Sequence, residues 1–437
     1  MNLIVSKFGG TSVGSAEGIK NLKEIVLKKQ ERKIIVVSAI SGATNLLLQI
    51  GIQAKERGDW KTILEKFKNN HYKIINDLKI KLDLSSYFNT LESFLFGIQS
   101  IKELTPRSRD YILSFGERLS SKIIENYLQN YISVNRINAK KIIKTDSSFG
   151  AAKLDIKKTQ EAIDEKLIPE LKNFDKIIVT GFIGSNKNNE YTTFSRGGSD
   201  YTAAILANAL NAVELEIWTD VDGILTANPL IIPQAKLIKN INYKEADELA
   251  YFGAKVLYSK TIKPVIQKKI PLRVCNTFNQ ENKGTLITEI SEKNIKSVSS
   301  KENSCIINIF SSKMLEEYGF LAKIFSIFLK YQVVVDVVST SAVNVSVTID
   351  SKPSQDFIKE LKKYACVDVF YQKTIICIVG EGINQNNDTL ARLFTSIKKY
   401  PVKMISQGSS TCNITLVVDK KNSEKVIQLI YKEFFNN

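Results

Sequence analysis

The chain has 437 residues, of which 43% are hydrophobic and 24% are charged. A domain usually has roughly 100–200 residues, so this is a folded protein of two to four domains, and its composition excludes a disordered chain, a collagen-like repeat and a disulfide-stabilised miniprotein. The net charge is +16, but the lysines are scattered along the whole chain, so we expect a solvated lysine-rich surface and no nucleic-acid partner.

The sequence has no membrane-spanning or secretory signal. No uncharged apolar run approaches the roughly 18 residues that cross a bilayer, and the residues from Met1 to Lys7 lack the basic and apolar regions of a signal peptide. We therefore expect a cytosolic protein with no membrane partner.

Cysteine and histidine show no metal-binding spacing. The five cysteines form no CxxC pair, and we expect small buried residues in a reducing compartment rather than a metal site. They are Cys275, Cys305, Cys366, Cys377 and Cys412. The single histidine, His71, lies in a lysine- and asparagine-rich helical stretch and is expected to be solvated. Histidine-dependent triads and zinc sites are therefore not expected.

The first part of the chain alternates strands and helices. Apolar runs at Leu3–Val5 and Ile34–Ser38 flank a helical pattern at Gly18–Gln30, which predicts a βαβ start and a parallel sheet. The pattern is helical from Asn45 to about Asn130, with Thr105-Pro106 as a helix start.

The alternation continues to about residue 290. The expected strands are Lys176–Thr180, Glu214–Val221 and Pro271–Asn276, and the expected helices are Asp200–Leu210 and Tyr243–Ala250. This order predicts a layered α/β domain with a mainly parallel sheet over residues 1–290.

The last third of the chain contains a repeat. Val333–Asp350 and Pro401–Asp419 each show an apolar strand, a Ser/Gly/Thr turn and a second strand ending in Asp. Each copy follows a strand and a helix, namely Ile306–Phe310 with Phe320–Tyr331 and Ile375–Val379 with Thr389–Tyr400. We predict two ferredoxin-like α+β modules, at 301–371 and 372–437, the second completed by a strand from 293–300. Small paired modules of this kind more often bind ligands or partners than perform chemistry.

A glycine-rich motif, Lys7–Gly14, follows the first strand and precedes a helix. Glycines let phosphate oxygens approach backbone N–H groups, and a helix N-terminus adds partial positive charge. Lys7 adds a full charge. The spacing is not GxxxxGK[ST], so a P-loop NTPase is not expected. A tight turn alone would explain the glycines but not the Lys, Thr and Ser around them.

Four further motifs combine glycine with polar residues. In Ser195–Ala204, Arg196 can hold a carboxylate bidentately, whereas Asp200 has a second interpretation as a helix cap. Phe115–Ser120 lies at a glycine interruption in a long helix, where a ligand site and a solvated Glu-Arg pair are equally plausible. Trp218–Leu225 ends a strand in an Asp-Gly turn, and Phe252–Leu257 supplies a second lysine.

Together these blocks resemble the aspartate kinases of the amino-acid-kinase superfamily. Five blocks match in the expected order: KFGGTSVGSAEGI, VVSAISGATNLL, SFGERLS, TTFSRGGSDYTAA and WTDVDGI with EADELAYFGAKVL. The tail resembles the regulatory ACT pair of that family, in its monofunctional, lysine-sensitive type. The resemblance implies a three-layer αβα catalytic domain followed by two ACT modules.

The resemblance also implies a reaction and a set of site residues. The enzyme would transfer the γ-phosphate of ATP to L-aspartate, giving 4-phospho-L-aspartate, with Mg²⁺ bound through the nucleotide. No general base is needed, because a carboxylate with a pKa near 3.9 is ionised at pH 7. The implied catalytic residues are Lys7, Asp200 and Lys255. The implied substrate contacts are Ser38, Thr44, Glu117 for the α-ammonium, Phe182, and Arg196 for the α-carboxylate. The implied nucleotide contacts are Lys7, Gly9, Gly10, Thr219, Asp220 and Lys255.

For the ACT pair, the resemblance implies a homodimer and L-lysine as effector. The implied effector contacts are Met314, Gly319, Phe320, Leu321, Asp336, Thr340 and Ser341. Tyr258 and Ser259 replace the usual His-Pro after Leu257, and five positions near the two implied sites also depart from the family pattern. Leu225, Asn228 and Leu230 replace a tyrosine, an aspartate and an arginine near the nucleotide, and Glu317 and Ala342 replace a serine and a glutamate near the effector. The nucleotide affinity and the effector (lysine, threonine or none) therefore stay open.

Other functions also stay open at this point. A kinase of the same fold could phosphorylate glutamate or an acetylated amino acid, although an acetylated substrate has no ammonium group for Glu117. A weakly catalytic amino-acid sensor that uses its ACT pair is the alternative from a different class.

Overall fold

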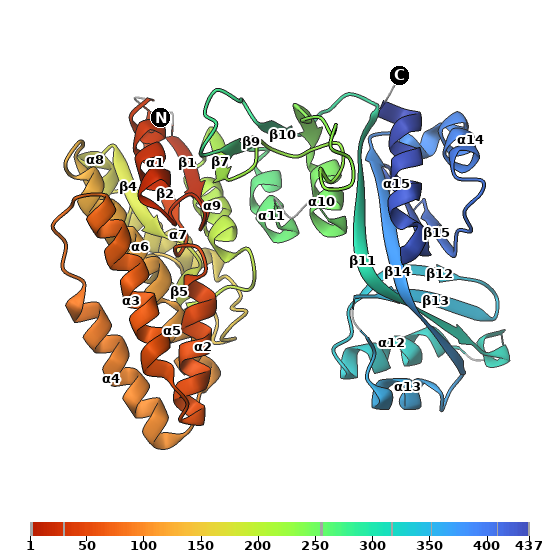
Figure 1. Ribbon diagram of the computed structural model, residues 1–437, viewed down its shortest axis with the longest axis horizontal. Coiled ribbons are helices and arrows are strands. Elements are labelled where there is room, and N and C mark those ends of the chain that lie inside the picture. Colours follow the sequence, from red (N-terminus) through yellow and green to blue (C-terminus); the bar gives the residue numbers. More distant parts are fainter. Residues whose placement is uncertain are drawn as a thin grey trace. The chain divides into compact units, whose positions relative to one another are not determined.

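The computed structural model describes residues 3–28, 31–253, 257–315, 318–350, 352–408 and 410–435. They divide into two compact units, Met1–Ile224 with Val256–Glu289 and Leu225–Lys255 with Ile290–Asn437. The ribbon in Figure 1 shows the elements of both units. Residues 225–255, which the sequence analysis placed in the catalytic domain, thus belong to the unit that carries the repeat.

The first unit holds the alternating strands and helices. Its strands are β1 (Leu3–Phe8), β2 (Arg32–Val37), β3 (Val134–Ile137), β4 (Lys176–Thr180), β5 (Ile183–Ser185), β6 (Tyr191–Thr193), β7 (Glu214–Thr219), β9 (Leu272–Asn276) and β10 (Thr285–Thr288). Its helices are α1 (Ala16–Lys28), α2 (Ala43–Glu56), α3 (Trp60–Asp77), α4 (Ser85–Ile101), α5 (Pro106–Leu113), α6 (Phe115–Leu128), α7 (Ile156–Lys166), α8 (Glu170–Asn173), α9 (Gly198–Ala209) and α11 (Ser259–Gln267), with a 3₁₀ turn at η1 (Ala139–Lys141).

The sheet of this unit runs in the order β3-β4-β2-β1-β7-β9-β10. All neighbouring pairs from β3 to β9 are parallel, and β10 pairs antiparallel with β9. The chain adds β2 on one side of β1 and β7 on the other, so β1 lies at a switch point of the topology. In open α/β sheets, ligands bind at the carboxyl ends of the strands at such a point. The predicted parallel sheet is confirmed.

The helices cover the sheet with apolar faces. Phe8, Ile35 and Trp218 on the strands lie in one core with residues of α1 to α6, and α9 contacts β1, β2 and β7. Figure 1 shows α2, α3 and α4 extending beyond the sheet. The predicted start of α5 is confirmed, since the Thr105 side chain accepts a hydrogen bond from the Ser108 amide and Pro106 follows it.

Two sequence expectations about the helices are wrong. His71 is completely buried, and its Nδ1 lies 2.8 Å from the Phe67 carbonyl oxygen. Burial lowers the pKa of its imidazole to about 4. The lysines and asparagines around it occupy the solvent face of α3, whereas His71 falls on the buried face with Leu64 and Phe67. The helix break near Gly116 in fact lies at Ser114, between α5 and α6.

The second unit holds the repeat. Its strands are β8 (Asn240–Asn242), β11 (Ile295–Phe310), β12 (Val335–Thr340), β13 (Asn344–Ile349), β14 (Cys366–Gly380), β15 (Met404–Gln407) and β16 (Asn413–Asp419). Its helices are α10 (Tyr243–Phe252), α12 (Phe320–Lys330), α13 (Gln355–Leu361), α14 (Asn387–Ser396) and α15 (Lys420–Phe435), with 3₁₀ turns at η2 (Ser312–Leu315) and η3 (Ile383–Gln385).

Both modules share one antiparallel sheet, in the order β12-β13-β11-β14-β16-β15. The long strands β11 and β14 run through both modules (Figure 1): Ile306–Phe310 pair with Cys366–Phe370, and Ile295–Lys301 pair with Ile375–Gly380. Each module has its own apolar core, one under α12 and α13 and one under α14 and α15.

Residues 225–255 join this unit through specific contacts. Ala227 and Ile232 lie in the core of the second module. Helix α10 begins with a capping box between Asn242 and Glu245, and the Glu245 carboxylate also accepts a hydrogen bond from the Glu381 amide. These side-chain bonds hold α10 against β11 and β14.

The cysteine prediction is wrong at one position. Four cysteines are buried, but Cys366, the first residue of β14, is exposed.

No helix among the described residues is long and apolar enough to cross a membrane.

Candidate active site and effector site

The predicted active-site residues of the first unit meet at one edge of the sheet. Phe182 follows β4, Ser38 follows β2, Gly9 follows β1 and Asp220 follows β7. These four strands are neighbours in the order β4-β2-β1-β7. Because parallel strands end at the same edge, residues far apart in sequence come together at the carboxyl ends of the sheet.

The loop after β1 presents backbone amides. The Gly9 amide donates to the Trp218 carbonyl oxygen at 3.0 Å, and the Ser12 hydroxyl donates to the same oxygen at 3.2 Å. The Gly9 amide, expected as a phosphate donor, is therefore engaged within the protein. Between these two anchors, the amides of Gly10, Thr11 and Ser12 donate to no group within the described residues. Successive amides of this kind are suited to bind phosphate oxygens.

Lys7 and Asp200 form an ion pair in this site. The Lys7 Nζ lies 2.5 Å from the Asp200 Oδ1, and both side chains are about nine-tenths buried. Asp200 lies in the first turn of α9, which begins after Gly197 in a left-handed conformation (φ 78°). A Cβ atom placed on Gly9 would lie 3.5 Å from the Lys7 Nζ. The ammonium is thus held at the glycine loop, where it can meet a transferred phosphoryl group.

Glu117 is a buried carboxyl group with one oxygen unpaired. Its Oε1 accepts a hydrogen bond from the Ala39 amide at 3.1 Å, and its Oε2 is buried with no partner among the described residues. Burial raises the pKa of Glu117 to about 8, although the Ala39 amide and the Lys7 charge act in the opposite direction. An unpaired buried carboxyl oxygen is costly, and a substrate ammonium group is a suitable partner for it.

Gly116 permits this placement of Glu117. A Cβ atom at residue 116 would lie 2.7 Å from the Ala39 Cβ. Only glycine therefore lets the first turn of α6 approach the end of β2 closely enough for Glu117 to reach the Ala39 amide. The glycine that the sequence marked as a possible ligand position serves the site through close packing.

Arg196 and Phe182 lie on the α9 side of the site. Arg196 is exposed, with its guanidinium 5.6 Å from the centre of the Tyr258 ring. Phe182 has a φ of 67°, a strained conformation for a bulky residue. Its amide donates to the Thr202 hydroxyl of α9 at 3.1 Å. A Cβ atom on Gly198 would lie 2.6 Å from the Phe182 ring, so the glycines of this motif admit the ring.

The other predicted contacts are less constrained. Thr44 is exposed in the first turn of α2, and the Ser38 carbonyl oxygen accepts a hydrogen bond from the Ser120 hydroxyl at 2.7 Å. The Thr219 hydroxyl donates to the exposed carboxylate of Asp220 at 3.1 Å. Lys255 lies outside the described residues.

The three residues that depart from the nucleotide pattern belong to the second unit. Leu225 forms a β-bridge with Leu237. The Asn228 side chain accepts a hydrogen bond from the Leu230 amide at 3.1 Å, and the Leu230 side chain is 91% exposed. Asn228 thus caps a local turn.

The predicted effector residues lie in the first module of the repeat. The Asp336 Oδ1 accepts hydrogen bonds from the Tyr251 hydroxyl and the Lys301 Nζ, each at 2.7 Å. Its Oδ2 is buried and has no partner among the described residues. Burial and the neighbouring Asp350 carboxyl group raise the pKa of Asp336, and Lys301 and Tyr251 oppose this shift. Asp336 therefore offers one oxygen to a cationic ligand.

The remaining effector residues lie at two places in this module. Gly319, with a φ of 80°, precedes α12, whose first residues are the buried Phe320 and the partly exposed Leu321. Met314 packs on the core of this module. The exposed Thr340 and Ser341 lead into the turn between β12 and β13, as does Ala342. Glu317 lies outside the described residues.

Sequence reasoning missed several residues of the site. The Ala39 amide and the Trp218 carbonyl oxygen act through the backbone, which no residue pattern reveals. Lys33 and Glu216 are buried inside strands β2 and β7. Each is a charged residue in a largely apolar strand, but Arg32 and Glu214 lie in the same two strands, so the pattern does not single out this pair.

Comparisons with known proteins agree with this arrangement. Residues 2–276 match the amino acid kinase family, and residues 376–434 match an ACT domain. Aspartokinase 1, chloroplastic, of Arabidopsis thaliana is 36% identical over 459 residues, which cover 99% of this chain and 80% of that protein. Lysine-sensitive aspartokinase 3 of Escherichia coli (strain K12) is 31% identical over 450 residues, which cover 99% of both chains.

Solved structures show the same likeness. The crystal structure of E. coli aspartokinase III in complex with aspartate and ADP, in its R-state, has a TM-score of 0.87 at 30% identity, covering 99% of this chain and 100% of that chain. The structure of the same enzyme with lysine and aspartate, in its T-state, has a TM-score of 0.80 at 31% identity, covering 99% of both.

Proposed function

The chain belongs to the amino acid kinase family and, within it, to the aspartokinases, and we propose how its own residues perform that activity. The reaction is ATP + L-aspartate → 4-phospho-L-aspartate + ADP, the first step towards lysine, threonine and methionine. The single observation that supports the substrate assignment most strongly is the buried Glu117 carboxyl group, with one oxygen held by Ala39 and the other unpaired.

Catalysis is a problem of charge rather than of proton transfer. The aspartate β-carboxylate is ionised at neutral pH and attacks the γ-phosphorus directly, so two anions must approach in line. Lys7 neutralises the oxygens of the transferred phosphoryl group, and Asp200 holds the ammonium in place through their ion pair. The free amides from Gly10 to Ser12 bind phosphate oxygens. Lys255, which lies outside the described residues, is proposed as a second ammonium group for the nucleotide phosphates.

Substrate recognition uses both α-groups of a free amino acid. The Glu117 carboxylate pairs with the α-ammonium, and the exposed Arg196 guanidinium pairs with the α-carboxylate. Ser38, Thr44 and Phe182 border the same space. The strained backbone at Phe182 is held by the Thr202 hydroxyl, as expected for a residue that shapes a binding site.

We expect Mg²⁺ to be bound through the nucleotide. The described residues hold no group of three or more His, Cys, Asp and Glu side chains that could bind a metal ion. Mg²⁺ would be held mainly by the phosphate oxygens of the nucleotide and by water, as it usually is in kinases. When bound, Mg²⁺ neutralises charge on the phosphates.

Regulation is assigned to the ACT modules. L-lysine is the proposed effector: its ammonium groups are attracted by the free Asp336 oxygen, and its carboxylate by the amides at the start of α12. A homodimer built on these modules is expected, because β12 and β15 are the edge strands of the shared sheet and a partner can cover such strands.

A coupled assay of ADP release tests the proposal. Activity that requires both MgATP and L-aspartate, and that falls as L-lysine is added, supports the kinase and its effector. Aspartate-dependent activity that lysine leaves unchanged overturns the effector assignment alone. Binding of ADP without any turnover favours the sensor function.

A further inference from the structure

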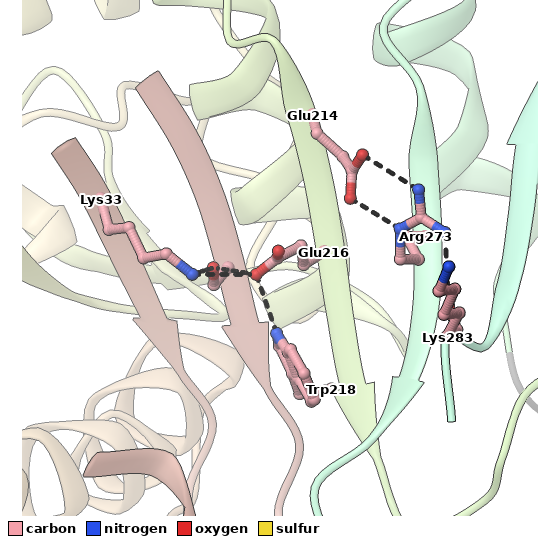
Figure 2. A network of polar contacts seen from close by, with 7 residues as sticks. Lys33, Glu214, Glu216, Trp218, Arg273 and Lys283 are labelled. Carbon is pink, nitrogen blue, oxygen red and sulfur yellow. Dashed lines mark hydrogen bonds and ion pairs between the residues drawn. The ribbon is translucent and has the colours of Figure 1, made fainter. Parts of the chain in front are cut away.

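A buried ion pair lies inside the sheet, below the glycine loop. Lys33 of β2 and Glu216 of β7 have side chains that are 0% and 2% exposed, and the Lys33 Nζ lies 3.2 Å from the Glu216 Oε2. The same oxygen accepts hydrogen bonds from the Ser6 hydroxyl at 2.7 Å and the Trp218 Nε1 at 3.0 Å. Figure 2 shows Lys33, Glu216 and Trp218 pointing toward one another.

The placement of this pair follows from the strand order. Strand β1 lies between β2 and β7, and Ser6 of β1 is directly opposite Glu216. Lys33 therefore reaches across β1, with Ser6 between the two charged groups. Two charges removed from water are costly unless they are paired and fully hydrogen-bonded. A buried ion pair adds little net stability, so stability alone does not account for the Lys33–Glu216 pair at the centre of the sheet.

Trp218 connects the ion pair to the active site. Its indole N–H is held by Glu216, and its ring stacks on Phe8 at 6.0 Å with an interplanar angle of 8°. Its carbonyl oxygen receives the two bonds that anchor the glycine loop, from the Gly9 amide and the Ser12 hydroxyl. Ser12 is fixed a second time by Thr277 at 2.7 Å.

We propose that Lys33 and Glu216 are positioning residues for the nucleotide phosphates, acting through Trp218 on the loop from Gly9 to Ser12. Glu216 orients the indole, the indole sets the direction of the Trp218 carbonyl group, and this carbonyl sets the loop whose amides face the phosphates. Lys33 holds the Glu216 carboxylate in place through their ion pair. The inference rests on the proposed function only in taking a nucleotide as the ligand.

The test compares two charge-balanced double variants. Lys33→Met with Glu216→Gln removes both charges but keeps an oxygen acceptor for the Trp218 N–H. Lys33→Met with Glu216→Leu removes the acceptor as well. If the oxygen acceptor at residue 216 positions the loop through the Trp218 N–H, the Gln variant binds ADP within about 2-fold of wild type and the Leu variant about tenfold more weakly. In the Leu variant, KM for MgATP rises while KM for aspartate stays unchanged, a split that a general loss of stability does not produce.

A matched control lies in the same strand. Glu214 of β7 forms a two-point ion pair with Arg273 of β9, at 2.8 and 3.3 Å, and Figure 2 shows this pair beside the first one. Within the described residues this pair makes no hydrogen bond to Trp218. Because the Arg273 charge also acts on Glu216, the control variant keeps Arg273: Glu214→Gln alone is expected to leave ADP affinity unchanged. Equal ADP affinity of the Gln and Leu variants overturns the proposal, as does an equal loss in the control.

A single variant covers the case in which the Leu variant does not fold. Trp218→Phe keeps an aromatic ring against Phe8 and removes the indole N–H together with the rest of the five-membered ring. Its ADP affinity is expected to fall about tenfold, and wild-type affinity overturns the proposal. Isothermal titration with ADP needs no turnover, so a wild-type protein that binds ADP but makes no aspartyl phosphate refutes the proposed function and still permits this test.

Discussion

The Glu117→Gln variant tests how the site recognises an amino acid. Burial raises the pKa of Glu117 from 4.5 to about 8, which corresponds to at most about 5 kcal/mol against the ionised form at ~1.4 kcal/mol per pH unit. In the ligand-free protein at pH 7, only about one molecule in ten carries the charge. An ammonium group beside the free Oε2 favours the ionised form, so aspartate binding releases a proton.

The pH dependence of KM follows from this proton. Between pH 6 and 7.5, KM for aspartate in the wild type is expected to fall about tenfold per pH unit. In Glu117→Gln the slope disappears, and KM at pH 7.5 rises by roughly 30- to 1,000-fold, or about 2–4 kcal/mol, because a buried charge pair is lost. Initial rates of ADP release at varied aspartate and pH measure both quantities.

The stability of the ligand-free protein depends on pH in the opposite direction. It falls as the pH rises, whereas the affinity for aspartate increases. The folded pKa of Glu117 lies above the unfolded value, so its contribution is fully present below pH 4.5 and is lost as the pH rises through 8. Glu117→Gln avoids this loss and is expected to melt at a higher temperature at pH 8 without aspartate. Glu125→Gln is the control: Glu125 lies on the same helix and pairs with Lys122 and Arg136. An unchanged KM slope in Glu117→Gln, or the same loss of affinity in Glu125→Gln, refutes the reasoning.

Three further predictions concern other ionisable residues. Lys7→Met is expected to lower kcat by at least about 1,000-fold while KM for aspartate changes by less than about 3-fold; steady-state kinetics check this, and a kcat near wild type contradicts it. His71 has a folded pKa of about 4, below its unfolded value of 6.5, so the free energy of unfolding decreases by up to about 3 kcal/mol as the pH falls from 6.5 to 4. Urea unfolding of His71→Leu should not show this decrease. If the variant and the wild type have the same pH profile, His71 is not a buried neutral imidazole. Lys301→Met removes the ammonium group that is hydrogen-bonded to Asp336, so lysine should inhibit the enzyme at a several-fold lower concentration. Asp336→Asn should abolish inhibition by lysine. Weaker inhibition of Lys301→Met would contradict the role of Asp336 as the group that binds lysine.

Much of the active site is predictable because it lies at strand ends. Parallel strands end at one edge of the sheet, so the motifs after β1, β2, β4 and β7 meet there once the alternation of strands and helices is recognised. Lys7 and Asp200 are brought together by the same geometry, one at a strand end and the other in the first turn of a helix. Polar residues with glycines at these positions carry enough signal to be found from sequence.

Other features depend on contacts that sequence order does not reveal. Lys33 and Glu216 can pair because their strands, β2 and β7, lie on either side of β1, so that the two side chains meet across it. This strand order is a property of the whole fold. His71 is buried because of its face on α3, which outweighs its polar neighbours in the sequence. Residues 225–255 belong with the repeat because Ala227 and Ile232 fill its second core, a contact between segments far apart in the chain.

Trapping the acyl phosphate with hydroxylamine tests the central claim most directly. Wild-type protein with MgATP is given L-aspartate, L-glutamate or N-acetyl-L-aspartate in parallel, and the hydroxamates are identified by mass spectrometry. The account predicts aspartyl hydroxamate from L-aspartate and little product from the other two acids. N-acetyl-L-aspartate has no free ammonium group for Glu117, and L-glutamate has one more methylene group between its ammonium group and the carboxylate that would be phosphorylated. Equal product from N-acetyl-L-aspartate, or none from L-aspartate, would contradict it.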